Sequence, residues 1–314
     1  MGLLSFALFA TVSSIVFYKK LDVPYEGDKQ ELYFPAGMHL SDIGQELQQK
    51  GLIPYRALFY FYFLFHPHHL SLKSGEYLFE KGETPAQILR KIFEGKCIVY
   101  KLSIPEGWTS LEIVERLNSI EKLEGNILDV PLEGTLFPST YYYKRGQRKE
   151  FLLNKMEKKM KRLLEEFQKR FPSENLNEKL IMASLVEKEA FKSPEKPRIA
   201  SVFYNRLKQG MKLQCDPTVI YGANKGKFIG YSYVTKEHLQ RDTPFNSYLY
   251  KGLPPTPICN PGKEALDAAF NPLATKDLYF VVKGNGEHEF NEHFSLHQKA
   301  VTRLRQMEQG MRNK

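Results

Sequence analysis

Two carboxylates lie two positions apart in an otherwise apolar segment, "IMASLVEKEAF" at residues 181–191. Asparagines just before this segment can cap a helix and Pro194 can end it, so the sequence predicts one helix over residues 178–192. At about 100° per residue, Glu189 falls near the centre of an apolar arc, and Glu187 diverges from it by about 200°. We therefore interpret Glu187 as a surface charge and Glu189 as the carboxylate that needs an explanation.

A carboxylate among apolar side chains is costly unless it is paired or protonated. One interpretation is structural, with Arg198 or Arg206 pairing with Glu189. The other is functional: desolvation raises the pKa of Glu189, so that it can donate a proton near neutral pH. The divergence of Glu187 from Glu189 excludes an acid–nucleophile pair that flanks one glycosidic bond.

Composition indicates a folded protein with a basic surface. A chain of 314 residues is long enough for roughly two domains, and 42% hydrophobic residues can form a core. The formal net charge of +9 favours an anionic lipid, nucleic acid or cell-wall partner, or is simply solvated. Three cysteines (Cys97, Cys215 and Cys259) lack metal-ligand spacing, and whether Cys215 and Cys259 form a disulfide stays open.

The N-terminus carries an uncharged apolar segment, residues 3–18, followed by Lys19 and Lys20. With Met1 and Gly2 it reaches the length of a short membrane-spanning helix. A cleaved signal peptide is the alternative, but neither a basic start nor a small-residue cleavage site is evident. We expect a transmembrane anchor at residues 1–20. By the positive-inside rule the two lysines alone would place the following chain in the cytoplasm.

Residues 21–128 show a strand–turn–helix pattern three times, at about residues 31–51, 75–95 and 99–120. Ser41, Thr84 and Thr109 are the expected helix caps, and Gly51 and Gly95 the stops. The unequal repeats favour small α+β modules over a solenoid. An aromatic run at residues 58–70 predicts a buried helix. It contains histidines (His66, His68 and His69), but no cysteine or acidic residue lies nearby, so we expect no metal there.

Residues 144–171 alternate basic and apolar side chains at helical spacing, which predicts an amphipathic helix with a cationic face. This face is either solvated or contacts an anionic polymer or membrane surface. Nucleic acid is disfavoured as a partner, because neither a zinc-finger pattern nor interleaved aromatic residues accompany the basic ones.

Several long motifs together resemble the endolytic murein transglycosylases, the YceG-like family. They are "EGTLFPSTYYY", "ASLVEKEA", "PRIASVFYNRLKQGMKLQCDPTVIYG", "TPFNSYLYKGLPPTPICNPG" and "LYFVVKGNGEHEFNEHFSLHQKAV", in order between about residues 130 and 305. The resemblance implies an α+β protein. An N-terminal transmembrane helix comes first, then LysM-like α+β modules at residues 21–128, then a mixed α+β catalytic domain at residues 129–314 with its catalytic glutamate on a helix.

The resemblance also implies an activity: cleavage within peptidoglycan glycan strands, between N-acetylmuramic acid and N-acetylglucosamine, to leave 1,6-anhydro ends. The family's catalytic glutamate is the second of the "EKE" pair, Glu189, acting as acid and then as base without a metal or cofactor. The implied location is the inner membrane with the catalytic domain in the periplasm, against the indication of the two lysines. The implied partner is peptidoglycan, with synthases at the membrane as further candidates.

Matching motif positions are expected to bind substrate: Gln214, Asp216, Thr218, Asn260, His288, Phe290 and Asn291. Asp216 also fits a plain Asp-Pro turn, and Asn260 a turn near the cleft. His293 and His297 have metal-ligand spacing, but the family uses no metal. The chain departs from the family pattern at Ala190, where threonine or serine is common, and at Cys215, where threonine is common.

Two other functions stay open on the sequence. A non-catalytic peptidoglycan-binding scaffold would use the LysM-like modules and leave the cleft inert. A basic nucleic-acid-associated protein would bind DNA in a strongly salt-dependent way, although an apolar N-terminal anchor speaks against it.

Overall fold

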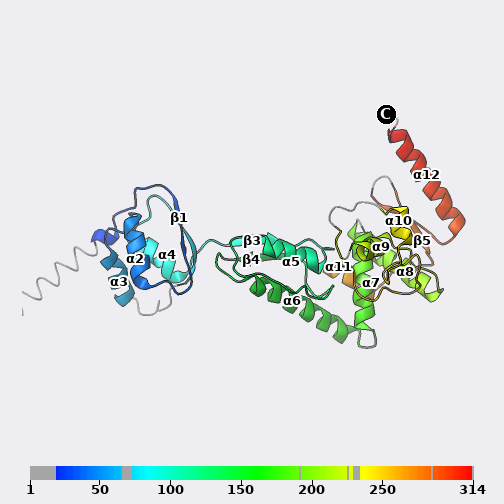
Figure 1. Cartoon of the computed structure of the whole chain (residues 1–314), viewed down its shortest axis with the longest axis horizontal. Helices are drawn as coiled ribbons and strands as arrows, with labels where there is room; N and C mark the ends of the chain where they lie inside the picture. Colours follow the sequence, from blue (N-terminus) through cyan, green and yellow to red (C-terminus); the bar gives the residue numbers. More distant parts are fainter. Residues whose placement is uncertain are drawn as a thin grey trace, which may run out of the picture. The chain divides into compact units, whose positions relative to one another are not determined.

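The computed structural model describes residues 19–65, 73–190, 192–224, 226–228, 234–283 and 286–312. The expected anchor therefore lies almost entirely outside the described residues, as do His66, His68 and His69. Within the described ranges, no helix combines the length and hydropathy needed to span a bilayer. The chain forms two compact units (Figure 1). The first contains the described residues up to Leu102 with Glu121–Glu124 and Tyr142–Arg148, and the second contains Ser103–Ile120, Gly125–Tyr141 and the described residues from Lys149. The predicted domain boundaries at residues 20 and 128 stay a prediction.

The first unit has the element order β1, α2, α3, β2, α4. Its bounds are β1 Gln30–Phe34, α2 Leu40–Gln49, α3 Arg56–Phe65, β2 Gly75–Phe79 and α4 Pro85–Glu94. The two strands pair antiparallel, with Leu32 opposite Tyr77. Aromatic side chains fill the core between sheet and helices, among them Phe59 and Tyr77, both fully buried.

Local sequence signals place α4 correctly but misplace the start of α2. Thr84 forms a capping box at the start of α4, and Gly95 ends it in the left-handed conformation at φ 70°. The prediction of Ser41 as a cap is wrong, because α2 begins at Leu40 and its cap position is occupied by His39, two residues before Ser41. Ser41 lies inside the first turn and its hydroxyl bonds to Asp42 instead.

A buried carboxylate ties later segments of the chain to β2. The Glu76 side chain is 4% exposed and pairs with Lys122 at 2.9 Å and Arg145 at 2.5 Å. Burial by itself would raise the pKa of Glu76, but hydrogen bonds from Lys122, Tyr100 and Arg145 lower it to about 2. These contacts explain why Glu121–Glu124 and Tyr142–Arg148 belong to the first unit.

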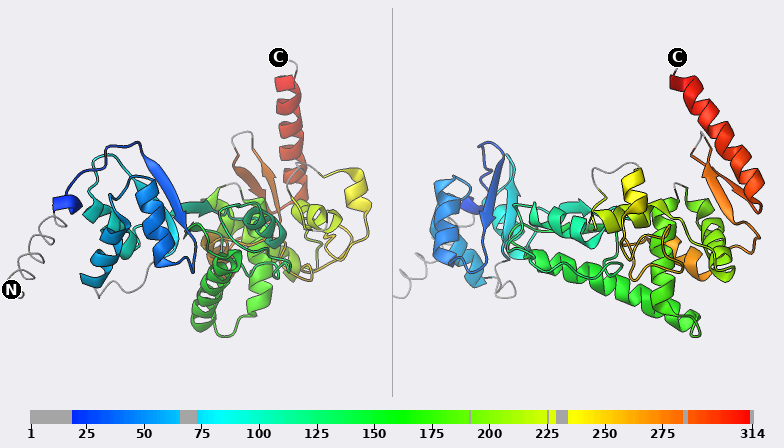
Figure 2. Two further views of the ribbon diagram at one scale, coloured as in Figure 1. Left: turned by 60° about the vertical axis from the view of Figure 1, so that its left-hand side comes forward. Right: turned by 45° about the vertical axis from the view of Figure 1, so that its right-hand side comes forward.

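The second unit is mainly helical. Its helices are α5 Ser110–Asn118, α6 Lys149–Arg170, α7 Leu176–Glu189, α8 Lys196–Lys208, α9 Asp216–Ala223, α10 Lys236–Gln240, α11 Lys263–Phe270 and α12 Phe294–Arg312, with a short 3₁₀ turn η2 at Ser193–Glu195. Strands β5 Tyr279–Val282 and β6 His288–Asn291 pair with each other in this unit. Strands β3 Tyr100–Ser103 and β4 Thr140–Tyr143 also pair with each other, and the residues of each are divided between the two units. The helix α12 packs against the β5–β6 hairpin (Figure 2). The coarse prediction of a mixed α+β chain is confirmed.

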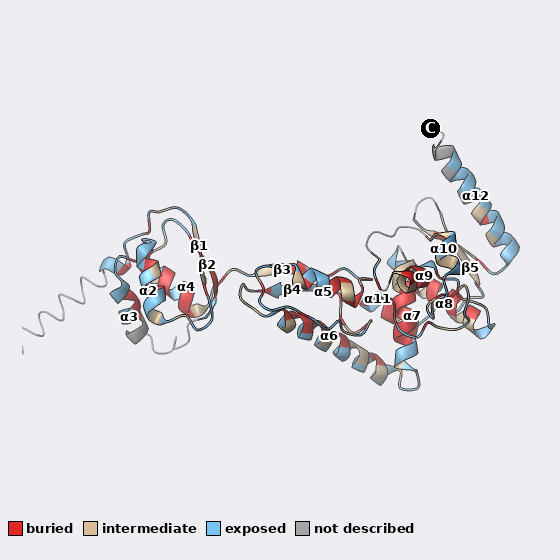
Figure 3. Ribbon diagram, viewed as in Figure 1, coloured by how far each residue is buried: buried red, intermediate tan, exposed pale blue. Residues whose placement is uncertain are grey.

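Helix α7 is the buried centre of the second unit. Every residue from Leu180 to Val186 is buried, and α8 and α11 both pack on it (Figure 3). The helix ends at Glu189 rather than at the predicted residue 192, and Ala190 is already extended. The carboxylate of interest therefore lies at the carboxyl end of the central helix.

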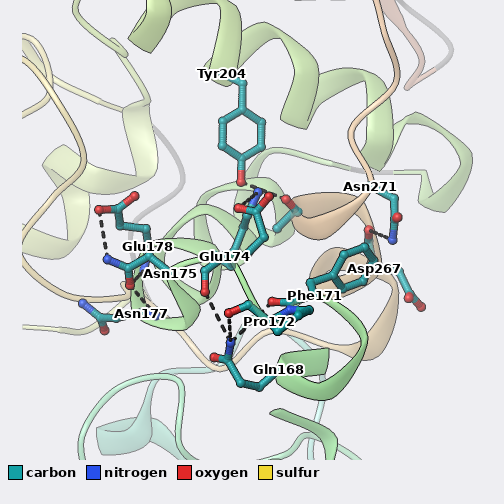
Figure 4. A network of polar contacts seen from close by, with 12 residues as sticks. Gln168, Phe171, Pro172, Glu174, Asn175, Asn177, Glu178, Tyr204, Asp267 and Asn271 are labelled. Atoms are coloured by element: carbon teal, nitrogen blue, oxygen red, sulfur yellow. Dashed lines mark hydrogen bonds and ion pairs between the residues drawn. The ribbon is translucent and has the colours of Figure 1, made fainter. Parts of the chain in front are cut away.

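Hydrogen bonds at the turn from α6 into α7 fix the start of the helix (Figure 4). The side-chain oxygen of Asn175 accepts from the amides of Asn177 and Glu178, at 3.1 and 3.3 Å, which confirms the asparagine cap. The side-chain amide of Gln168 donates to three backbone oxygens of the same turn, those of Phe171, Pro172 and Glu174. Because the start of α7 is fixed and its middle is buried, the end of the helix that carries Glu189 has a defined position.

Candidate active site

The end of α7 opens into a pocket of about 320 Å³. Glu189 lines this pocket together with residues from α8, the loop before α9, and the β5–β6 hairpin and α12. The full lining is Glu189, Arg206, Leu213, Gln214, Asp216, Tyr248, Phe280 and His297. The pocket thus gathers a carboxylate from the central helix and polar groups from segments far apart in the sequence.

Desolvation dominates the electrostatics of Glu189 and raises its pKa to about 7. A hydrogen bond from the Cys215 thiol and the charge of Arg206 lower the pKa, and the charge of Asp216 raises it. Glu189 also lies at the carboxyl end of α7, the negative end of the helix dipole, which disfavours a negative charge. Glu189 therefore holds a proton in a large fraction of molecules at neutral pH, which suits a general acid.

Neither candidate arginine neutralises Glu189. Arg198 forms an ion pair with Asp277 at 2.7 Å. Arg206 lines the pocket, but it donates to the backbone oxygens of Leu278 and Leu213 at 2.6 and 2.7 Å. Within the described part of the chain, Glu189 has no ion-pair partner, so the interpretation of a structural, arginine-paired glutamate is not supported.

The prediction that Glu187 is a surface charge is wrong. Its side chain is 7% exposed, pairs with Lys196 at 2.9 Å and accepts a hydrogen bond from the amide of Gly262 at 2.9 Å. The helical wheel failed because α7 is buried on nearly all sides. The polar side of the wheel meets the starts of α8 and α11 rather than solvent.

Two of the predicted binding residues line the pocket. Gln214 is the one described non-glycine residue with positive φ, at 48°. Its backbone N–H donates to the Ser247 carbonyl at 3.2 Å. Asp216 begins α9 and accepts a 2.5 Å hydrogen bond from the Tyr248 hydroxyl. Gln214 and Asp216 are exposed, and Tyr248 is partly buried. The hydrogen bond from the Tyr248 hydroxyl holds one carboxylate oxygen of Asp216 in the pocket.

Thr218 lies beneath this loop. Its buried hydroxyl donates to the Cys215 carbonyl at 2.7 Å and bonds to the Ser247 hydroxyl at 2.8 Å. Thr218 does not line the pocket. It holds in place the loop that carries Gln214 and Asp216.

The other four predicted residues lie outside the pocket lining. Asn260 is fully buried and bonds to the backbones of Leu136 and Trp108. The His288 ring bonds to Glu195 at 2.8 Å. The guanidinium carbon of Arg198 lies 4.4 Å from the centroid of the Phe290 ring. Asn291 is buried at the end of β6. In this structure these side chains support the unit around the pocket, and substrate contact by them stays a prediction.

Sequence reasoning missed Tyr248 and Phe280 as pocket residues. Both stand inside quoted motifs, "TPFNSYLY" and "LYFVV", which was the available signal. Arg206 and His297 were considered from the sequence in other roles, as a structural ion-pair partner and as a metal ligand. Both line the pocket. Across the described ranges, no three His, Cys, Asp or Glu side chains are grouped as a metal site. The three cysteines are buried free thiols.

Comparison with known proteins assigns the family. The model of the YceG-like family matches residues 32–303 of this chain. The chain belongs to the YceG-like family.

Named relatives are also similar to this chain. A Bacillus subtilis (strain 168) protein named endolytic murein transglycosylase is 30% identical over 324 residues, covering 91% of this chain and 89% of the relative. A protein of the same name from Streptococcus pneumoniae serotype 2 (strain D39) is 29% identical over 292 residues. The alignment spans 79% of this chain but about half, 53%, of the pneumococcal protein.

A solved structure of the YceG-like family is also similar. The crystal structure of a yceG-like protein from Listeria monocytogenes superposes with a TM-score of 0.54 at 30% sequence identity. The match covers 87% of this chain and 99% of that one. The similarity therefore extends over both units rather than over the pocket alone.

Proposed function

We propose that this YceG-like protein is an endolytic murein transglycosylase. It cleaves peptidoglycan glycan strands internally, between N-acetylmuramic acid and N-acetylglucosamine, and leaves 1,6-anhydro-N-acetylmuramic acid ends. The observation that carries the proposal is Glu189, a desolvated carboxyl group with a pKa of about 7 in a pocket of polar side chains. The names of the Bacillus and Streptococcus relatives support the same reaction.

Bond cleavage begins with proton transfer from Glu189. The neutral carboxyl group donates its proton to the glycosidic oxygen, so that N-acetylglucosamine leaves as an alcohol and positive charge develops at C1 of the muramic acid. Asp216 in the same pocket raises the pKa of Glu189 and so favours the protonated form needed for this step.

The anhydro bond forms in the second step. The Glu189 carboxylate accepts the proton of the C6 hydroxyl of the same muramic acid, and the C6 oxygen bonds to C1, which restores the neutral acid. Because the nucleophile belongs to the substrate, its high effective concentration replaces an enzyme nucleophile or a positioned water. One acid–base carboxyl group is then sufficient.

The expected substrate contacts follow from this reaction. Gln214 and Asp216 offer polar groups in the pocket for sugar hydroxyl or N-acetyl groups, and Thr218 positions their loop. We propose that four further residues shape the pocket through the loops and hairpin that they stabilise: Asn260, His288, Phe290 and Asn291.

The first unit is proposed to be a LysM-like glycan-binding module. The order β1, α2, α3, β2, with the two strands paired antiparallel, supports this proposal. We further propose that residues 1–20 anchor the protein in the inner membrane, that the catalytic unit faces the periplasm, and that peptidoglycan synthases at the membrane are its neighbours. The apolar segment at residues 3–18 is the support for the anchor.

Product analysis tests the proposed reaction. Purified peptidoglycan is digested with the full chain, and the muropeptides are analysed by mass spectrometry. We expect internal fragments with anhydro ends, which weigh one water less than hydrolysed ends. Hydrated reducing ends would indicate a hydrolase instead. Binding to sacculi without any released fragment would support the non-catalytic scaffold.

A further inference from the structure

His297 has a fixed position in the wall of the catalytic pocket. It lies in the first turn of α12 and lines the pocket that contains Glu189. Its ring stacks on Tyr279, with centroids 5.2 Å apart and planes 23° apart, and the Phe294 ring lies 6.2 Å away. The stacked rings hold the imidazole plane, so its polar edge points in a defined direction.

The surroundings of His297 select one tautomer. Its Nδ1 atom is buried and has no hydrogen-bond partner among the described residues. A buried N–H without an acceptor is costlier than an unused lone pair, so the proton of the neutral ring belongs on Nε2. Because Nδ1 is buried and His297 lines the pocket, Nε2 is the ring nitrogen that is left to serve the pocket.

The ring also stays neutral. Burial and the charge of Arg206 lower the pKa of His297 below its ordinary value. A second proton would go to Nδ1, where no acceptor meets it. His297 is therefore a fixed, uncharged hydrogen-bond donor at the pocket surface.

The charged pocket groups Asp216 and Arg206 suit other partners. Asp216 can only accept hydrogen bonds when ionised, which suits sugar hydroxyl groups. Arg206 directs two of its donors to the backbone of Leu213 and Leu278. A neutral donor that faces a glycan best fits a neutral acceptor without a proton of its own, and in N-acetylated sugars that acceptor is the acetamido carbonyl.

We propose that His297 is a substrate-binding residue whose Nε2–H donates a hydrogen bond to an acetamido carbonyl of the glycan strand. This inference rests on the proposed function. His297 takes no part in proton transfer, which stays with Glu189.

Binding measurements on the full chain test the donor. Soluble glycan strands are titrated into the Glu189→Gln protein, in which no strand is cleaved, and the dissociation constant is compared with that of double variants. Added His297→Leu and His297→Asn should each weaken binding about threefold to tenfold, because leucine donates nothing and the asparagine amide is too short to reach the Nε2 position. Added His297→Gln, whose amide nitrogen can occupy that position, should stay within about twofold.

A matched control and a modified substrate complete the test. His293→Leu removes an exposed histidine four residues earlier, just before the start of α12 and outside the pocket lining, and should change nothing. Strands with their acetyl groups removed should bind the double variant Glu189→Gln, His297→Leu as well as they bind the Glu189→Gln protein, because these strands lack the acceptor. The difference between the two substrates is a readout that a merely structural role of His297 would not produce.

Equal weakening on acetylated and deacetylated strands would overturn the assignment of the acceptor, and no weakening by His297→Leu would overturn the inference as a whole. Both results would leave the proposed function intact. Failure of the Glu189→Gln protein to bind acetylated strands at all would instead contradict the proposed function, and this inference with it.

Discussion

The buried ion pair next to the catalytic carboxylate offers a quantitative test of the packing around α7. Glu187 and Lys196 are 2.9 Å apart, with side chains 7% and 4% exposed. Glu187→Gln removes the negative charge but keeps an oxygen that can accept from the amide of Gly262. The substitution therefore isolates the charge from the hydrogen bond.

The expected cost follows from what remains around Lys196. Removing one member of a buried ion pair costs ~3–5 kcal/mol, because the other charge is left unpaired. Glu106 at 3.5 Å and Glu264 at 3.9 Å still offset part of the lysine charge. We therefore expect a loss at the lower end, ~3 kcal/mol, which for a domain of this kind corresponds to a fall in Tm of ~6–12 °C.

Unfolding can be followed selectively in the second unit. Trp108 is the single tryptophan of the chain and lies in that unit, where its carbonyl accepts from Asn260. Its fluorescence in thermal and urea unfolding therefore reports on the unit that contains α7. Glu115→Gln is the matched control, because its pair with Lys227 is about half exposed on both sides and should contribute ~0–1 kcal/mol.

A double variant sharpens the reasoning. Glu187→Gln with Lys196→Met removes both charges, so the double variant should be clearly more stable than the sum of the two single losses predicts. Additive losses, or a Glu187→Gln protein as stable as the Glu115→Gln control, would refute the view that this pair determines the packing of the α7 end.

The pH dependence provides two further predictions. Because cleavage needs protonated Glu189, kcat/KM should fall as the pH rises through about 7. The Cys215 thiol lowers the pKa of Glu189, so the midpoint of this fall should move to higher pH in Cys215→Ala. Asp216 raises the pKa of Glu189, so the midpoint should move to lower pH in Asp216→Asn. Opposite or absent shifts in the pH–rate profiles would contradict the assigned contacts. The raised pKa also affects folding: the folded state holds its proton more tightly than the unfolded state, so the stability contributed by the neutral carboxyl is complete below pH 4.5 and is lost as the pH rises to about 7. Urea unfolding should therefore show Glu189→Gln to be more stable than the parent by ~3 kcal/mol at pH 8 and equal to it near pH 4; a constant difference at both pH values would count against a desolvated Glu189.

Features governed by local chemistry were predictable from the sequence. The caps at Thr84, Thr109 and Asn175 were each indicated by a side chain that bonds nearby backbone amides. Glu189 stood out because apolar neighbours within one helix already imply desolvation. The long motifs gave the family, because together they span most of the second unit.

Features that depend on packing between distant segments were not predictable. Glu187 looked like a surface charge on a single helix, and only the starts of α8 and α11 make it buried. The pocket is lined in part by Tyr248 and His297, which lie far from Glu189 in the sequence. A motif match also does not separate residues that line a cleft from residues such as Asn260 that hold its loops.

The central claim is that the Glu189 carboxyl group transfers the proton that breaks the glycosidic bond. The most direct measurement is the rate at which Glu189→Gln releases anhydro-ended fragments from purified peptidoglycan, beside the parent and Glu292→Gln, which changes an exposed carboxylate of the same unit. We expect release by Glu189→Gln to fall by a factor of ~10² or more, with the Trp108 emission of the folded protein unchanged, and release by Glu292→Gln to equal that of the parent. Release by Glu189→Gln at the rate of the parent would contradict the account.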